Sequence, residues 1–222
     1  MITASDLPEP DRLSSFAPSA PDAALEFFGN CFPLLQSYAG LLTTVAIPRG
    51  VLGPREASRL WDRHLLNCGV LAEVIPSHVT VCDLGSGAGL PGLVLAIARP
   101  DLRVILLEPL LRRVTFLQQS IDTLGLRNVE VRRGRAEDHA DPLTVDVVVA
   151  RAVARLGSLI RLSSPLLKKG GELLAMKGES APQEVTQARR ELRQWAKEWS
   201  VVRLGEKFLE HPTTVVRVRM KQ

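Results

Sequence analysis

The sequence predicts an α/β fold in which an N-terminal helical appendage precedes a mainly parallel, doubly wound sheet. Three observations lead to this prediction: β-branched runs alternate with helical patterns from residue 77 onward, a glycine-rich turn follows the first of these runs, and residues 22–76 show only helical spacing. A chain of 222 residues fits one domain of ordinary size with a sizeable core. We therefore expect a flexible acidic tail (1–21), a helical appendage (22–76) and a sheet domain (77–222).

Composition excludes several classes of protein. The chain is 45% hydrophobic with a formal net charge of +4, which does not fit a disordered chain. It contains no run of roughly 18 to 20 apolar residues, the length that a membrane-spanning helix needs. Its acidic, proline-containing start lacks the features of a signal peptide. The chain has three cysteines, Cys31, Cys68 and Cys82, and they form no CxxC pair. This is typical of a reducing compartment, so we expect a cytoplasmic protein, and we expect it to bind no metal.

The net charge is unevenly distributed along the chain. Residues 1–30 hold five acidic residues and one arginine, a net charge of −4, so the remaining residues carry +8. Of the 28 basic residues, 22 are arginine, whose planar side chain suits phosphate groups. Charge alone leaves two interpretations open, a polyanionic partner or a mildly basic surface.

The appendage is predicted from helical spacing. Apolar residues recur at this spacing from Leu25 to Leu42, with a break expected at Pro33. A second helical stretch follows Gly53-Pro54 and continues to Cys68.

The sheet domain is predicted from short β-branched runs separated by helical patterns. The expected strands are 79–84, 103–107, 129–131, 145–149, 172–176, 201–204 and 214–220. The expected helices are 90–98, 111–125, 156–167 and 182–199.

The turn after the first strand is the most informative stretch. It contains four glycines, which allow the backbone to approach a ligand closely, at positions Gly85, Gly87, Gly89 and Gly92. The spacing GxGxxG suggests a dinucleotide site, but Asp83 at the strand tip would repel a pyrophosphate. A carboxylate there suits a ligand with an amino group or a sulfonium. We therefore expect cofactor binding by Asp83 and by the turn residues Gly85, Ser86, Gly87 and Gly89.

The next two strands extend this site. Glu108 ends the second strand 25 residues after Asp83, near the offset at which an acidic residue accepts hydrogen bonds from ribose. The third strand leads into residues 134–138, where a doubly wound sheet holds a nucleobase. We expect an adenosine-type pocket at the carboxyl ends of the first three strands.

Several motifs resemble one known family. The segments DLGSGAGLPG, LLEPLLRR, GRAED, ARAVA and AMKG occur in this order, and RLWDRHLLN precedes them. Together they resemble the bacterial ribosomal RNA small subunit methyltransferase G family, also called glucose-inhibited division protein B, over residues 54–220.

This resemblance implies a class I, Rossmann-like fold that uses S-adenosyl-L-methionine to methylate N7 of one guanine in small-subunit (16S) ribosomal RNA. It implies cofactor contacts at Gly85, Gly87, Leu90, Ala136 and Glu137. Arg151 matches an arginine assigned to both the cofactor and the active site, so we expect it to be the catalytic residue. The chain differs from many relatives at Asn67-Cys68, where Asp-Ser is common.

The implied chemistry agrees with the end of the fourth strand. Guanine N7 carries a lone pair and no proton, so its methylation needs no general base. The strand ends in Val149-Ala-Arg-Ala152 and lacks the Asp-Pro-Pro-aromatic cluster of enzymes that act on exocyclic amines. A cationic Arg151 could hold guanine O6 or a phosphate; the alternative is a structural arginine at the strand end.

The expected partner is ribosomal RNA or the small ribosomal subunit. Between residues 99 and 135, eight arginines outnumber four acids, which favours an electrostatic track for RNA. The candidate RNA-binding residues are Arg112, Arg113, Arg135, Lys177 and His64. Lys177 could equally be a solvated lysine, and the apolar neighbours of His64 favour a packing role.

Two alternative functions stay open: a small-molecule methyltransferase, and a catalytically silent RNA-binding assembly factor. The intact Asp83, glycine turn and Glu108 argue against the second. We expect a monomer that does not associate with membranes.

Overall fold

A seven-stranded sheet forms the centre of the molecule, and it confirms the predicted, mainly parallel and doubly wound topology. The computed structural model describes residues 10–138 and 144–221. The strands lie in the order β3-β2-β1-β4-β5-β7-β6, and β7 runs antiparallel to both of its neighbours. The strands are β1 (Thr80–Leu84), β2 (Arg103–Glu108), β3 (Val129–Arg133), β4 (Val145–Arg151), β5 (Leu167–Lys177), β6 (Ala196–Leu204) and β7 (Thr213–Met220).

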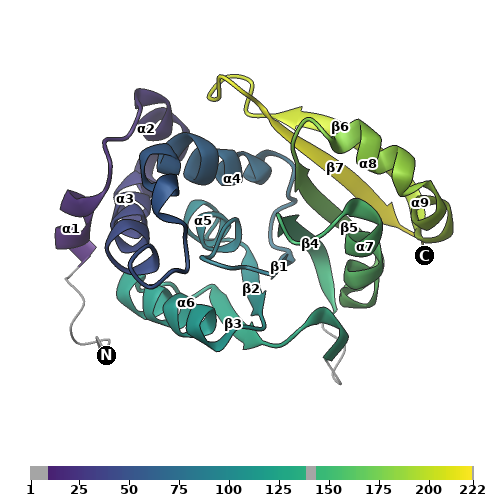
Figure 1. Cartoon of the computed structure of the whole chain (residues 1–222), viewed down its shortest axis with the longest axis horizontal. Coiled ribbons are helices and arrows are strands. Elements are labelled where there is room, and N and C mark those ends of the chain that lie inside the picture. Colours follow the sequence, from purple (N-terminus) through teal and green to yellow (C-terminus); the bar gives the residue numbers. More distant parts are fainter. Residues whose placement is uncertain (1–9, 139–143, 222) are drawn as a thin grey trace.

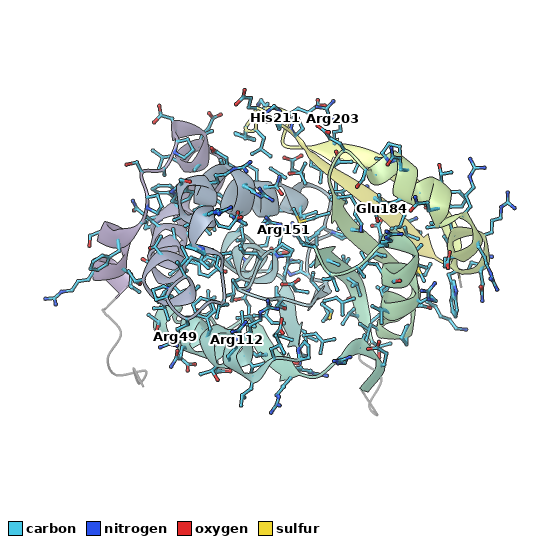
Figure 2. The ribbon with its side chains drawn as sticks, in the orientation of Figure 1. Arg49, Arg112, Arg151, Glu184, Arg203 and His211 are labelled. Atoms are coloured by element: carbon cyan, nitrogen blue, oxygen red, sulfur yellow. The ribbon has the colours of Figure 1, made fainter. Side chains whose placement is uncertain are left out.

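Helices cover both faces of the sheet (Figure 1). The appendage packs on one face together with α5 (Gly92–Ala98) and α6 (Leu111–Leu124). The other face carries α7 (Leu156–Ser163), α8 (Ala181–Gln187) and α9 (Arg189–Trp195). Arg151 ends β4 near the middle of the same view (Figure 2).

The appendage is built from short helical pieces. They are α1 (Pro10–Leu13), α2 (Asp22–Phe28), α3 (Phe32–Leu41), a π-helical turn (Leu42–Ala46), a 3-10 segment (Pro54–Arg59), a second π-helical segment (Leu60–Leu66), α4 (Asn67–Gly69) and a 3-10 turn (Val70–Glu73). The break expected at Pro33 lies earlier, at Gly29, where φ is +46°. Pro33 itself occupies the first turn of α3, where its missing N–H costs no helical hydrogen bond.

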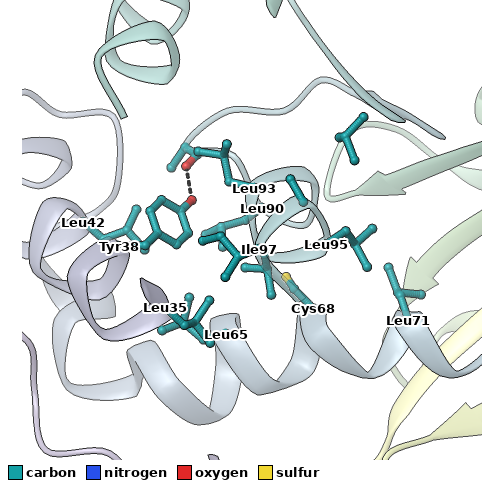
Figure 3. Packing of buried hydrophobic residues seen from close by; sticks show 14 of the residues in the cluster. Leu35, Tyr38, Leu42, Leu65, Cys68, Leu71, Leu90, Leu93, Leu95 and Ile97 are labelled. Carbon is teal, nitrogen blue, oxygen red and sulfur yellow. Dashed lines mark hydrogen bonds between the residues drawn. The ribbon is translucent and has the colours of Figure 1, made fainter. Parts of the chain in front are cut away.

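One hydrophobic core joins the appendage to the sheet. Leu35, Tyr38 and Leu65 of the appendage are buried in the same cluster as Leu93 and Ile97 of α5 (Figure 3). The Tyr38 hydroxyl donates a hydrogen bond of 2.5 Å to the carbonyl of Ala88 in the glycine turn. The appendage therefore supports the turn directly.

The expected tail differs from the structure in its second half. Leu13 is fully buried. The backbone of Leu13 lies so close to Gly40 that a Cβ at position 40 would clash with the carbonyl oxygen of Leu13. Trp61 donates its indole N–H to the carbonyl of Pro18 (2.9 Å). These contacts hold residues 12–18 against the appendage; the acidic residues Asp6 and Glu9 lie outside the described residues.

The single helix predicted over residues 182–199 is wrong. Two short helices, α8 and α9, meet at Ala188, and the chain then enters β6 at Ala196. Trp199 and Val201 pair with Val218 and Val216 of β7. Aromatic and β-branched side chains fit a strand, and this pairing overrides the helical spacing of the preceding residues.

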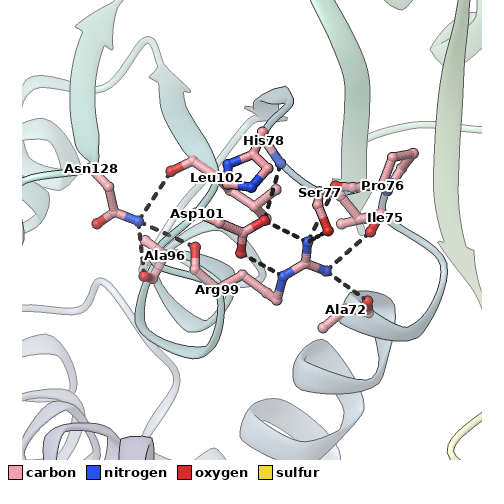
Figure 4. A network of polar contacts seen from close by, with 10 residues as sticks. All are labelled: Ala72, Ile75, Pro76, Ser77, His78, Ala96, Arg99, Asp101, Leu102 and Asn128. Atoms are coloured by element: carbon pink, nitrogen blue, oxygen red, sulfur yellow. Dashed lines mark hydrogen bonds and ion pairs between the residues drawn. The ribbon is translucent and has the colours of Figure 1, made fainter.

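Arg99 connects the end of α5 to the segment that leaves the appendage (Figure 4). Its guanidinium donates hydrogen bonds to the carbonyls of Ala72 (3.1 Å), Ile75 (3.0 Å) and Pro76 (3.2 Å). Asp101 accepts from Arg99 Nε at 2.7 Å and from the His78 amide at 3.1 Å.

We expect Arg99→Ala to lower the free energy of unfolding by about 2 kcal/mol, because it leaves several carbonyl groups and Asp101 without their charged donor. Urea denaturation measures this change. The control is Arg103→Ala, which removes a side chain that is 64% exposed and should change stability by less than about 0.5 kcal/mol. Equal effects of the two substitutions would contradict a structural role for the Arg99 contacts.

Candidate active site

The site lies where the strand order of the sheet reverses. β1 has β2 on one side and β4 on the other, and Leu84 of β1 is in register with Ala150 of β4. In open α/β sheets, ligands bind outside the carboxyl ends of the strands at such a reversal. Asp83 near the end of β1 and Arg151 at the end of β4 are therefore placed at the expected edge.

A cavity of about 410 Å³ opens beside the ends of β1 and β2. It brings together four of the predicted cofactor-binding residues: Gly85, Glu108, Ala136 and Glu137. Two arginines predicted to bind RNA, Arg113 and Arg135, line the same cavity. We call this space the first cavity.

The glycine turn has the conformation that its sequence indicates. Gly85, Gly87 and Gly89 have φ values of +72°, +60° and +88°, which side-chain-bearing residues rarely adopt. At Gly92, a Cβ would lie 2.3 Å from Leu106 Cδ2 and 2.6 Å from Asp83 Oδ2. Glycine at this position lets the first turn of α5 approach Asp83 closely.

Asp83 carries an unusual buried carboxylate. Its side chain is 1% exposed, and its Oδ2 accepts a hydrogen bond from the Gly92 amide (2.9 Å). Its Oδ1 is buried without a hydrogen-bond partner among the described residues. Burial raises the pKa of Asp83 to about 7. An unpaired buried acceptor of this kind suits a cationic ligand, and in this respect the site fits a cofactor that carries a sulfonium and an amino group.

Glu108 is held firmly at the rim of the first cavity. It is 1% exposed; Oε2 accepts from the Gly87 amide (2.9 Å) and Oε1 from the Leu110 amide (3.0 Å). Arg113 lies 3.6 Å from Oε2. A carboxylate has about four acceptor positions, so two remain for the hydroxyl groups of a ribose.

The other predicted residues of the turn shape the site from behind. Ser86 is buried, and its hydroxyl donates to the carbonyl of Asp83 (2.9 Å). Leu90 is 9% exposed and belongs to the core. Gly87 and Gly89, like Ser86 and Leu90, are not among the described residues that line the first cavity.

Arg151 is held by residues of the appendage. Its Nη1 donates to Cys68 Sγ (3.2 Å) and its Nη2 to His64 Nδ1 (2.8 Å). The other ring nitrogen of His64, Nε2, lies 2.7 Å from Glu56 Oε2. Burial, followed by the charge of Arg151, lowers the pKa of His64 to about 4. The ring is therefore neutral at pH 7, accepts from Arg151 at Nδ1 and donates to Glu56 from Nε2.

The structure does not expose His64 for the RNA contact that the sequence suggested. His64 is 5% exposed and both of its ring nitrogens are engaged, so it cannot offer a contact to RNA. Its burial agrees with the alternative, a packing histidine, and it also accepts a hydrogen bond from Arg151.

Other predicted RNA-binding residues occupy different places. The Lys177 side chain is 10% exposed, donates to the Ala154 carbonyl (2.7 Å) and pairs with Glu184 at 2.8 Å. Arg112 is exposed on α6, next to Gly50, and lies outside the described lining of both cavities.

A second cavity of about 540 Å³ adjoins the first, and Ala152 and Val153 line both. Three residues that line it were not among the predicted site residues: Arg63, Asn67 and Arg155. Glu56 and Cys68 were likewise not predicted as partners of Arg151 and His64. Glu56 lies in the 3-10 segment and His64 in the following π-helical segment, so regular helical spacing does not indicate this pair.

The sheet order, the glycine turn, the buried acid at the end of β1 and the acid at the end of β2 define the fold of class I S-adenosylmethionine-dependent methyltransferases. Two solved structures share this fold. An SAM-dependent methyltransferase from Aquifex aeolicus is 20% identical with a TM-score of 0.56 and covers 79% of this chain and 98% of its own. TYW2 of M. jannaschii, solved in complex with AdoMet, is 18% identical with a TM-score of 0.53 and covers 70% and 74%.

The sequence comparison is more specific. Residues 32–211 match the family described as rRNA small subunit methyltransferase G. The Ribosomal RNA small subunit methyltransferase G of Thermobifida fusca is 56% identical over 198 residues, which cover 89% of this chain and 84% of that protein. The protein of the same name from Streptomyces avermitilis is 51% identical over 205 residues, covering 91% and 86%. The chain therefore belongs to the rRNA small subunit methyltransferase G family, as the motifs indicated.

We expect Asp83→Asn to weaken binding of S-adenosylmethionine by at least about tenfold, which corresponds to about 1.4 kcal/mol, because the amide cannot balance a cation. Affinity of the unsubstituted protein should rise between about pH 6 and about pH 8 as Asp83 loses its proton, and the Asn variant should lose this rise. Isothermal titration calorimetry measures both effects. Asp122→Asn, at an exposed position of α6, is the control. Unchanged affinity and pH dependence in Asp83→Asn would contradict a cation at this site.

We expect His64 to make unfolding dependent on pH. Its folded pKa of about 4 lies below the value of about 6.5 in an unfolded chain, so only the unfolded state binds a proton between these values. The stability of the unsubstituted protein relative to His64→Gln should be constant above about pH 6.5 and fall toward pH 4, by at most about 1.4 kcal/mol per pH unit. Urea denaturation at several pH values measures this difference. A difference that does not change with pH would show that His64 is not buried in its neutral form.

Proposed function

We propose that this protein transfers a methyl group from S-adenosyl-L-methionine to N7 of a specific guanine in small-subunit (16S) ribosomal RNA. The observation that carries this proposal is the position of Arg151. It lies at the end of β4, is fixed by a neutral histidine, and lines the second cavity, which adjoins the first. The family to which the chain belongs supports the same reaction.

The first cavity and the glycine turn would hold the cofactor. Glu108 would accept hydrogen bonds from its ribose, and Asp83 would balance its positive charge. The remaining cofactor-binding residues would shape the turn and the far wall: Gly85, Ser86, Gly87, Gly89, Leu90, Ala136 and Glu137. When bound, the cofactor supplies an electrophilic methyl group attached to a sulfonium sulfur.

The reaction needs no proton transfer. N7 would use its lone pair to bond the methyl carbon, the carbon–sulfur bond would break, and the electron pair of that bond would stay on sulfur. The positive charge moves to the base. Among the described residues that line the second cavity, Glu184 carries the one carboxylate, and it is paired with Lys177. The site therefore favours a nucleophile that arrives without a proton.

Arg151 would act by positioning. Its guanidinium can donate to guanine O6, which lies beside N7 on the same edge of the base. Alignment of two bound reactants can remove about 7–11 kcal/mol of an activation barrier in favourable cases. His64 and Glu56 would hold Arg151 in the orientation that this alignment needs.

We propose that the RNA approaches along a basic surface that includes Arg112, Arg113 and Arg135. Ribosomal RNA or the small ribosomal subunit is then the partner. We also propose that the protein acts as a monomer. All three cysteines are free thiols, which supports a reducing, cytoplasmic location. Among the described residues, no helix could span a membrane and no cluster of side chains could hold a metal ion.

We also propose a division of labour along the chain. The acidic tail (1–21) precedes the appendage (22–76), which contributes His64 and Cys68 to the site. The methyltransferase domain (77–222) contributes Asp83, Glu108 and Arg151.

We expect purified protein and labelled S-adenosylmethionine to methylate small subunits from cells that lack this modification. Mapping of the labelled nucleotide should give 7-methylguanosine at one position. Subunits that already carry the modification are the control and should take up no label.

Three results would contradict the proposal. Label on an adenine would exclude guanine N7. Label on metabolites without dependence on ribosomal particles would favour a small-molecule methyltransferase. Binding to subunits without any transfer would favour a silent assembly factor.

A further inference from the structure

The second cavity is markedly basic. Four cationic side chains line it, Arg63, Arg151, Arg155 and Lys177, against the single carboxylate of Glu184 among the described lining residues. Such an excess of positive charge in a concave site favours an anionic ligand.

The four cations are not equivalent. Lys177 is neutralised by Glu184 at 2.8 Å, and Arg151 is held inward by His64 and Cys68. Arg63 is half exposed, and its Nε lies 3.7 Å from Glu56, beyond hydrogen-bond distance. Arg155 is exposed at the start of α7. The two exposed guanidinium groups therefore come from two different parts of the chain, one from the appendage and one from the segment after β4.

An apolar wall separates the two cavities. Val153 is 37% exposed and lines both of them, and a Cβ at Gly85 would lie 2.9 Å from its Cγ2. The preceding residue, Ala152, has a φ of +54°, which is strained for a residue other than glycine. Val153 thus lies against Gly85 of the glycine turn, two residues after Arg151 in the chain. The exposed part of the Val153 side chain offers an apolar contact to a base.

We infer that the second cavity receives the target nucleotide of the RNA, with its base between Val153 and Arg151 and its phosphates on Arg63 and Arg155. This inference rests on the proposed function and adds the site and the residues that bind the substrate. The cavity volume of about 540 Å³ lies in the range of small-ligand sites, so it suits one extruded nucleotide and not a duplex. A planar guanidinium can hold phosphate through two parallel hydrogen bonds.

The test uses Arg63→Ala and Arg155→Ala in the full-length protein. Each should raise KM for unmethylated small subunits at least about tenfold and leave kcat within about threefold, because a phosphate contact acts in binding. Filter binding gives the slope of log affinity for subunits against log salt concentration. The magnitude of this slope should fall by about 1 in each variant. The cofactor affinity should stay unchanged.

Two further variants make the test specific. Arg103→Ala removes the same charge from an exposed position at the amino end of β2, the opposite edge of the sheet, and should keep the original KM and salt slope. Arg63→Lys and Arg155→Lys keep the charge but lose the planar fork, and should restore the salt slope while KM recovers in part. Thermal melting of each variant checks that it is folded.

Two outcomes would overturn the inference. In the first, Arg63→Ala and Arg155→Ala have the same KM and the same salt dependence of affinity as the control variant Arg103→Ala. The other is a loss of kcat at unchanged KM, which would place these residues in the chemical step. Failure of the proposed function is distinct from both, because the unsubstituted protein would then produce no 7-methylguanosine.

Discussion

The hydrogen bond from Arg151 to Nδ1 of His64 joins the two parts of the chain at the point where the site forms. A partly buried guanidinium needs partners for its donors, and the appendage supplies them through His64 and Cys68. His64 can accept only while its ring is neutral; its burial and the charge of Arg151 keep the ring neutral, and the bond to Glu56 places the ring proton on Nε2. The appendage thus fixes the orientation of a side chain that belongs to β4, and its shared core with α5 holds the whole arrangement in place.

A second constraint acts at the end of β1. Asp83 is buried with one acceptor atom unpaired among the described residues, an arrangement that lowers stability in the absence of a ligand. The close approach of Gly92 and the hydroxyl of Tyr38 on Ala88 keep the turn rigid around this carboxylate. The unpaired Oδ1 of Asp83 lowers the stability of the fold, and the packing around the turn compensates for this cost. Such a local loss of stability is typical of binding sites.

The sequence predicted the order of the strands because each contains an apolar or β-branched run that can be recognised locally; β5 and β6 extend well beyond their predicted runs, 172–176 and 201–204. The glycine turn, Asp83 and Glu108 were also predictable, since each follows a strand directly. The point at which α9 ends could not be predicted, because Trp199 and Val201 belong to a strand only through their pairing with β7. The role of His64 was not predictable either: its partner Arg151 is 87 residues away, and only the packing of the appendage brings them together. Arg63 and Arg155 both line the second cavity, although they lie far apart in the sequence, and only the packing of the folded chain brings them together.

The appendage acts on methyl transfer, in this mechanism, by holding Arg151. A double-mutant cycle with His64→Gln and Arg151→Lys, read as single-turnover methylation rates on unmethylated small subunits at saturating cofactor, tests it most directly. If His64 acts by holding Arg151, the double variant should be about as slow as Arg151→Lys alone. If the two losses instead multiply, His64 and Arg151 act independently, and that result would contradict the account.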